Sequence, residues 1–83
     1  MRKMKSTRFD TTINVVQHII VKNMWEYYIT DEVTDSDDIK FCLVVGDETE
    51  LGDVWLEEIK PYIITDTTKL NDVLPAPNWV WID

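Results

Sequence analysis

Carboxylates are the most abundant residues of this chain that could do chemistry. Sixteen of its 83 residues are Asp or Glu. Several stand in close pairs: Asp37/Asp38, Glu48/Glu50 and Glu57/Glu58. Acid–base hydrolysis by two carboxyl groups needs contrasting environments, one of them buried enough to hold a proton. These pairs lie in polar sequence, so we expect ionised surface groups and a protein that is not an enzyme.

The chain has one cysteine and one histidine, Cys42 and His18. A single cysteine excludes an intramolecular disulfide and a cysteine-rich metal site. A catalytic thiol needs a base such as histidine beside it. Cys42 stands inside the strongest strand pattern, which predicts a small buried apolar residue. His18 lies off the main apolar stripe of its segment, which predicts a solvated or partly packed side chain.

Residues 31–38, DEVTDSDD, form the one stretch that suggests a metal site. The stretch lacks the central glycine and the distal bidentate Glu of a calcium-binding EF-hand loop. The chain's two glycines cannot build a glycine-rich phosphate loop. We therefore expect no metal and no cofactor, and we interpret residues 31–38 as a solvated loop.

Charge is distributed unevenly along the chain. Residues 1–25 carry five basic residues and one acidic residue, whereas residues 26–83 carry three basic and fifteen acidic residues, for a net charge of −8. Such an acidic body repels phosphate and argues against direct binding of nucleic acid. It favours a basic protein partner, here a basic host protein, or only solubility.

The strongest structural signal lies in residues 38–62. Residues 39–45 are dominated by β-branched and aromatic side chains, as is typical of a strand. Alternation predicts that Phe41 and Leu43 point into the core and that Lys40 is exposed. A turn is predicted to begin at Gly46. Residues 48–56 follow as a second extended segment, in which Gly52 marks a bulge or a close approach of another backbone segment. Residues 56–60 are predicted to form a helical turn.

Residues 41–59, FCLVVGDETELGDVWLEEI, resemble a segment in a family of uncharacterised small proteins carried on plasmids and phages. The shared pattern is a strand that leads through a glycine to E-L-G, an aliphatic residue, and L-x-E-L or L-x-E-I. The resemblance implies a strand, turn, strand and helix start, and an origin on a mobile element. It implies no activity and no functional residue.

We predict an α+β fold for the whole chain as a single domain, residues 1–83. A helix is expected at residues 11–23 because apolar residues recur at spacings of three and four. A strand is the alternative there, because β-branched residues are abundant. A small antiparallel sheet of three or four strands would include residues 25–30, 39–45 and an edge strand at 62–65.

The ends of the chain complete this prediction. Residues 1–8 are expected to be a flexible basic tail. A short helix is expected at residues 67–74, and residues 78–83 are expected to dock as a short strand that carries Trp79 and Trp81. No segment approaches the ~20 apolar residues of a membrane span, and no signal peptide is recognisable, so we expect a cytoplasmic protein that does not bind membranes.

The sequence thus favours a small acidic protein that binds or inhibits a host protein, in one version as a mimic of DNA. The alternatives are an accessory subunit that self-associates and a metal-dependent hydrolase that uses the acidic loop. The candidate partner-binding residues are Asp35, Asp37, Asp38, Asp47, Glu48, Glu50, Asp53, Glu57, Glu58, Trp55 and Trp79.

Overall fold

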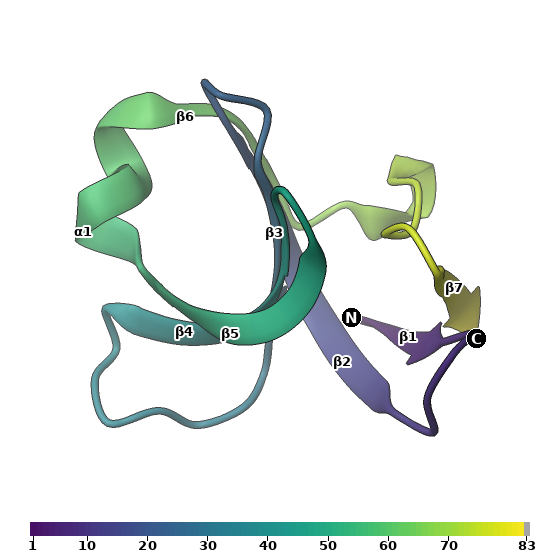
Figure 1. The fold of residues 1–83 in the computed structure, drawn as a ribbon. Coiled ribbons are helices and arrows are strands. Elements are labelled where there is room, and N and C mark those ends of the chain that lie inside the picture. Colours follow the sequence, from purple (N-terminus) through teal and green to yellow (C-terminus); the bar gives the residue numbers. More distant parts are fainter. Residues whose placement is uncertain (83) are drawn as a thin grey trace.

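The structure, a computed structural model, describes residues 1–82 as one antiparallel sheet with short helical turns (Figure 1). The strands are β1 (Arg2–Ser6), β2 (Thr12–Val21), β3 (Glu26–Thr30), β4 (Ile39–Val45), β5 (Thr49–Trp55), β6 (Ile63–Thr67) and β7 (Trp79–Ile82). The helices are α1 (Leu56–Ile59) and the 3₁₀ turns η1 (Lys60–Tyr62) and η2 (Leu70–Asp72). The strand order is β5-β4-β3-β2-β1-β7, with β6 also paired to β2.

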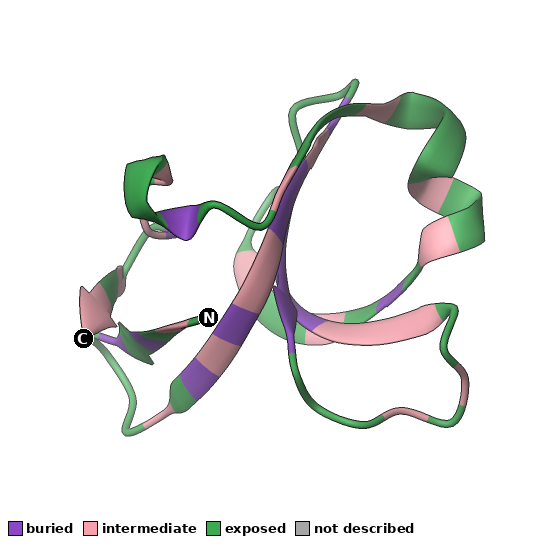
Figure 2. Ribbon diagram, turned by 180° about the vertical axis from the view of Figure 1, so that it is seen from behind, coloured by how far each residue is buried: buried purple, intermediate pink, exposed green. Residues whose placement is uncertain are grey.

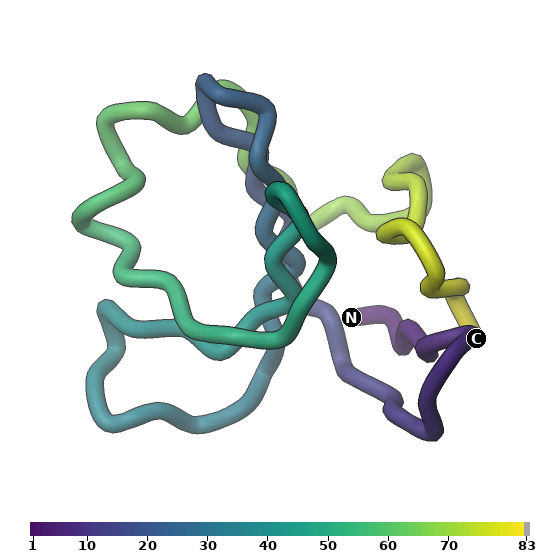
Figure 3. Tube along the Cα trace, in the orientation of Figure 1, coloured from purple at the N-terminus to yellow at the C-terminus, as the bar shows by residue number. Residues whose placement is uncertain are grey.

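Strand β2 joins the two halves of the molecule. One edge of β2 pairs with β3. The other edge pairs first with β1, along residues 12–15, and then with β6, along residues 18–21. In Figures 1 and 3, α1 and β6 consequently lie toward one end of β2, while β1 and β7 lie toward the other.

The helix expected at residues 11–23 is wrong, because these residues form β2. The register with β3 shifts between Val15 and Gln17, which marks a β-bulge. Ile13 and Val15 point to one side of the sheet, whereas Val16 and Ile19 pack on the other. A bulge therefore changes which residues face each side, and the resulting three- and four-residue spacing imitates a helix.

Two apolar cores lie on opposite faces of β3, because successive residues of a strand point to opposite sides. The first core contains Met4, Ile13, Val15, Tyr28, Leu43, Leu70 and Ala76. The second core contains Ile19, Val21, Tyr27, Ile29, Cys42 and Val54. Figure 2 shows buried positions along β2 and β3, where both cores meet the sheet. Both faces of β3 are therefore covered.

The α+β prediction with three or four strands is corrected by these findings. The seven-stranded sheet dominates, and the longest helix, α1, has four residues. Residues 2–6 of the expected flexible tail form β1 between β2 and β7. The helix expected at residues 67–74 is reduced to the single turn η2, in a segment that also contains Thr67, Thr68 and Asn71, whose side chains favour turns over helices.

Several local predictions are confirmed. β3 and β4 form an antiparallel pair on either side of the acidic loop, the helical turn begins at Leu56, and a short strand forms at β7. Leu43 is buried as expected, but Phe41 is only half-buried. On the other face of β4, Cys42 is buried in the second core, as its place in the strand pattern predicted. No bulge occurs at Gly52, since the β4–β5 register is continuous.

Candidate partner-binding surface

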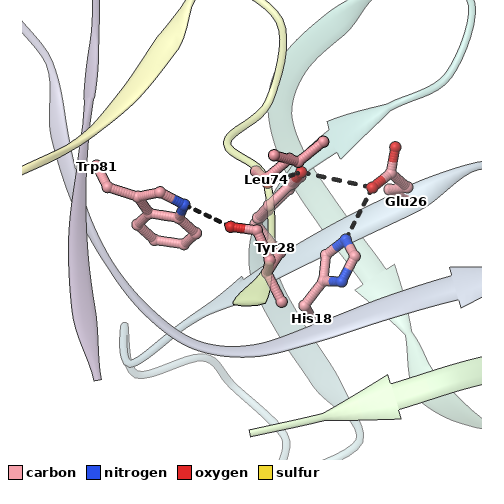
Figure 4. A network of polar contacts seen from close by, with 6 residues as sticks. His18, Glu26, Tyr28, Leu74 and Trp81 are labelled. Atoms are coloured by element: carbon pink, nitrogen blue, oxygen red, sulfur yellow. Dashed lines mark hydrogen bonds and ion pairs between the residues drawn. The ribbon is translucent and has the colours of Figure 1, made fainter. Parts of the chain in front are cut away.

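A polar network in the first core involves the only histidine (Figure 4). His18 Nε2 donates to Glu26 Oε1 at 2.8 Å, because an ionised carboxylate can only accept. The Tyr28 hydroxyl donates to the carbonyl oxygen of Leu74 at 2.9 Å, and the His18 and Tyr28 rings lie 4.6 Å apart. His18 is only 4% exposed, contrary to the solvated or partly packed side chain that we expected. The network thus ties β2 and β3 to the segment that contains Leu74.

The same network secures the C-terminal segment. Trp81 Nε1 donates to the carbonyl oxygen of Val73 at 2.8 Å. The Arg2 guanidinium lies 4.4 Å from the centre of the Trp81 ring, within the range of a cation–π interaction. Trp79 and Trp81 are both half-buried against the first core, as the docking prediction required. Trp81 is therefore occupied by intramolecular contacts.

Cys42 is fully buried in the second core. Burial, reinforced by the charge of Asp53, raises the pKa of its thiol to about 12. His18 contacts Tyr28 on the first-core side, so the thiol and the imidazole lie on opposite faces of the sheet. A Cys–His catalytic pair is thereby excluded for these two residues.

All nine candidate carboxylates are exposed. Two hollows beside β5 and a third beside α1 bring several of them together. Asp35 and Asp53 line one hollow between the β3–β4 loop and β5. Glu50, Asp53 and Glu58 line a second, together with Trp25 and Trp55. Asp38 and Glu57 line a third, beside α1.

The remaining candidates lie at the margins of this region. Asp47 and Glu48 form the exposed tip of the β4–β5 hairpin, and Asp37 lies in the exposed β3–β4 loop. Trp79 lines a hollow on the other side of β5 with Phe9 and Leu51. Glu50 and Leu51 line both that hollow and the one that contains Trp25. Strand β5 is thus the element common to most of the predicted site.

One hollow has a floor made by the second glycine of the chain, and we call it the Gly52 groove. It is lined by Trp25, Val44, Glu50, Gly52, Glu58 and Ile59, among others, and by no Lys or Arg. A Cβ atom on Gly52 would meet only Val44, at 3.9 Å, which is an ordinary contact. The glycine thus leaves open a space that a side chain could fill.

The other glycine positions the wall of the same groove. A Cβ atom on Gly46 would lie 2.7 Å from the indole ring of Trp25, which is too close for any real contact. The Trp25 ring therefore packs directly on the backbone of the hairpin and is held there at 37% exposure. Trp25 was absent from the predicted partner-binding residues, because only tertiary packing reveals its contact with Gly46.

The outer edge of β5 has no neighbouring strand within residues 1–82. Hydrogen bonds from Gly46 N–H to Glu48 O and from Leu56 N–H to Asp38 O close the two ends of the β4–β5 ladder. Residues of an antiparallel pair alternate between hydrogen-bonded and non-bonded positions. This register directs residues 50, 52 and 54 at β4, so the backbone groups of residues 49, 51, 53 and 55 point outward.

The described residues contain no cluster of three or more His, Cys, Asp or Glu side chains arranged to hold a metal ion. Over the same residues, no helix is long and apolar enough to cross a membrane. Compared with models of protein families, with curated proteins and with solved structures, the chain matches none. The candidate surface therefore has to be interpreted from its own geometry.

Proposed function

We propose that this protein is a non-enzymatic binding protein that engages a basic protein partner through the surface around β5. The observation that carries the proposal is the Gly52 groove, where Glu50 and Glu58 lie with the exposed Trp25 indole and no Lys or Arg is in the lining. The net charge of −8 attracts a basic partner over a distance set by the ionic strength. We also propose that the partner is a cytoplasmic host protein, inhibited by a protein of mobile-element origin.

Charge and aromatic area contribute differently to such binding. Exposed carboxylates mainly speed association, because long-range attraction steers the encounter. Trp55, which is 55% exposed, and Trp25 supply apolar area that can be desolvated on contact. Large aromatic side chains commonly act as anchors in protein interfaces. The combination favours specific protein binding over carboxylates that serve only as solvation.

Binding through the groove is favoured over mimicry of DNA, in which the carboxylates would imitate phosphates for a DNA-binding protein. Mimicry along a strand would use carboxylates at alternate positions on one face, about 6.6 Å apart. In β5 the acidic residues are Glu50 and Asp53, which point to opposite faces. Mimicry therefore has to rely on carboxylates from several elements.

The test is a pull-down from host lysate, followed by titration calorimetry with the captured protein at several salt concentrations. Wild type is compared with Glu50→Gln/Glu58→Gln, and with Asp47→Asn/Glu48→Gln as a control of equal charge change at the hairpin tip. We expect weaker binding and a flatter salt dependence for the first variant, and a smaller effect for the control. Equal affinity for all three proteins at every salt concentration would refute the proposal. Capture of a DNA-binding protein that DNA displaces would support mimicry.

Self-association is the second candidate, and the unpaired edge of β5 is the observation that favours it. Two copies could pair such edges across a two-fold axis. The acidic residues beside the edge would then face one another, which opposes this arrangement. Analytical ultracentrifugation distinguishes self-association from binding to a basic partner. A dimer that persists at micromolar concentration, together with a pull-down that captures no partner, supports the accessory-subunit role.

A further inference from the structure

We infer that the partner's binding segment is an extended, arginine-containing strand that adds to the outer edge of β5 and places one arginine side chain over Gly52. This inference rests on the proposed function and specifies the chemistry of the partner. It depends on three features that meet at β5: an unpaired strand edge, an open groove and an excess of negative charge.

The first feature is the set of free backbone groups. Residues 49, 51, 53 and 55 direct their N–H and C=O groups away from β4, and no other strand of residues 1–82 pairs with β5. Unpaired groups on an edge strand are a template for an added strand. Extended peptides bind many proteins in this way, with affinity from main-chain hydrogen bonds and specificity from alternate side chains.

The second feature is the register that such a strand would adopt. In antiparallel addition, a ligand residue opposite Gly52 occupies a non-hydrogen-bonded position, because Gly52 directs its own backbone groups at β4. Side chains of such a pair lie on the same face and close together. That face is the one on which Val54 enters the second core and Gly52 leaves the groove open. A long ligand side chain can therefore extend across Gly52 into the groove.

The third feature selects the chemistry of that side chain. The groove presents the Trp25 ring together with the carboxylates of Glu50 and Glu58. A guanidinium group can stack on an indole and donate hydrogen bonds to carboxylates at the same time. The absence of Lys and Arg from the lining leaves these carboxylates without a cation in the groove. Arginine matches all three groups.

The glycines give independent support for this occupant. Gly46 allows the Trp25 ring to lie on the hairpin, and Gly52 keeps the adjacent floor empty. Neither glycine has a positive φ, so backbone conformation does not require glycine at either position. Both positions are explained by the shape of the same groove.

The test uses a fluorescein-labelled nonapeptide that alternates threonine and arginine, measured by fluorescence anisotropy. Three peptides are compared: the parent, a form N-methylated at every amide that cannot pair as a strand through either edge, and a form with citrulline in place of the central arginine. We expect about tenfold weaker binding for each altered peptide, since each loses main-chain pairing or the cationic contact. Equal binding of the parent and the N-methylated peptide would overturn strand addition.

Protein variants separate this inference from the proposed function. Gly52→Val places a branched side chain over the groove, with a Cβ atom that meets only Val44 at 3.9 Å, and should weaken binding of the parent peptide about tenfold; a thermal melt checks that the variant stays folded. Asp72→Asn removes an exposed carboxylate of η2, outside the Gly52 groove; it serves as the control and should bind nearly as wild type. If the lysate partner binds wild type and loses affinity with Glu50→Gln/Glu58→Gln, but Gly52→Val binds it normally, this inference fails and the proposed function stands. If the double variant also binds normally, both fail.

Discussion

The first core and the surface around β5 use the same residue types in opposite ways. On the first-core side, Glu26 bonds His18 and the Trp81 indole bonds a backbone carbonyl. Around β5, Glu50 and Glu58 are exposed in a groove, and the Trp55 ring faces solvent. Composition alone does not distinguish these two groups of acidic and aromatic residues. Their contacts within the protein do, because the first group is bonded inside the fold and the second is exposed.

The largest expected effect contrasts two leucines that are cross-strand neighbours, Leu43 and Leu51. Leu43 is fully buried in the first core, whereas Leu51 is 39% exposed. Leu43→Ala should lower the free energy of unfolding by about 2–5 kcal/mol, because it leaves a cavity. Leu51→Ala should cost less than about 1 kcal/mol. Urea denaturation measures both, and equal losses would show that the β5 side is as closely packed as the first core.

A second contrast concerns two tryptophans. Trp81→Leu removes the hydrogen bond to Val73 and the contact with Arg2, and should cost about 2–4 kcal/mol. Trp55→Leu should change stability by no more than about 0.5 kcal/mol but weaken partner binding. Thermal melts and calorimetry with the captured partner test the pair. A large stability loss in Trp55→Leu would contradict its assignment to the binding surface.

Alkaline pH should act on both cores through buried acids. Burial raises the pKa of Cys42 to about 12 from an ordinary value of 9.0. Burial, followed by the charge of Glu26, also raises the pKa of Tyr28. The folded chain then keeps protons that the unfolded chain releases, so stability is fully present below pH 9 and falls above it.

Above pH 9, the free energy of unfolding should fall by no more than about 1.4 kcal/mol per pH unit for each group that stays protonated in the folded chain. Urea denaturation between pH 8 and pH 11 measures it. Cys42→Ala provides the control, because it should remove the part of the decline that begins near pH 9. An identical pH dependence in this variant would assign the whole decline to other groups.

The smallest effects concern the two glycines. Gly46→Ala should displace the Trp25 ring and cost about 1 kcal/mol, with a change in the near-UV circular dichroism of tryptophan. Gly52→Ala should be neutral or stabilising by up to about 1 kcal/mol, because alanine restricts the unfolded chain and meets no obstacle. A destabilised Gly52→Ala variant would show that the groove floor is closed.

The sequence predicts the region from β4 to α1 well because its signals are local. A β-branched run, a glycine turn and a short L-E-E-I segment each specify their own conformation, and the structure contains all three. The prediction fails at β2, where the bulge after Val15 shifts the apolar pattern and favours a helix. It fails at β1 because four polar or basic residues flank the buried Met4, and the strand is ordered by pairing with β2 and with β7 at the other end of the chain.

The candidate site divides in the same way. Polar sequence context predicts the exposure of the nine carboxylates, and all nine are exposed. The Gly52 groove depends on the packing of Trp25, in the β2–β3 turn, against Gly46, in the β4–β5 turn. No local sequence pattern predicts that contact. The free edge of β5 depends on the strand order of the whole sheet. The partner role of these residues remains a prediction.

The pairing of β1 with β7 has a consequence for biosynthesis. Met4 lies opposite Trp81, so the first core needs a strand that emerges from the ribosome after every other described element. The second core draws on residues between Val16 and Ile63 and is available earlier. Contacts between distant residues also slow folding in general. We therefore expect the half that carries the Gly52 groove to fold first during translation, while the outer edge of β1 remains unpaired until β7 is synthesised.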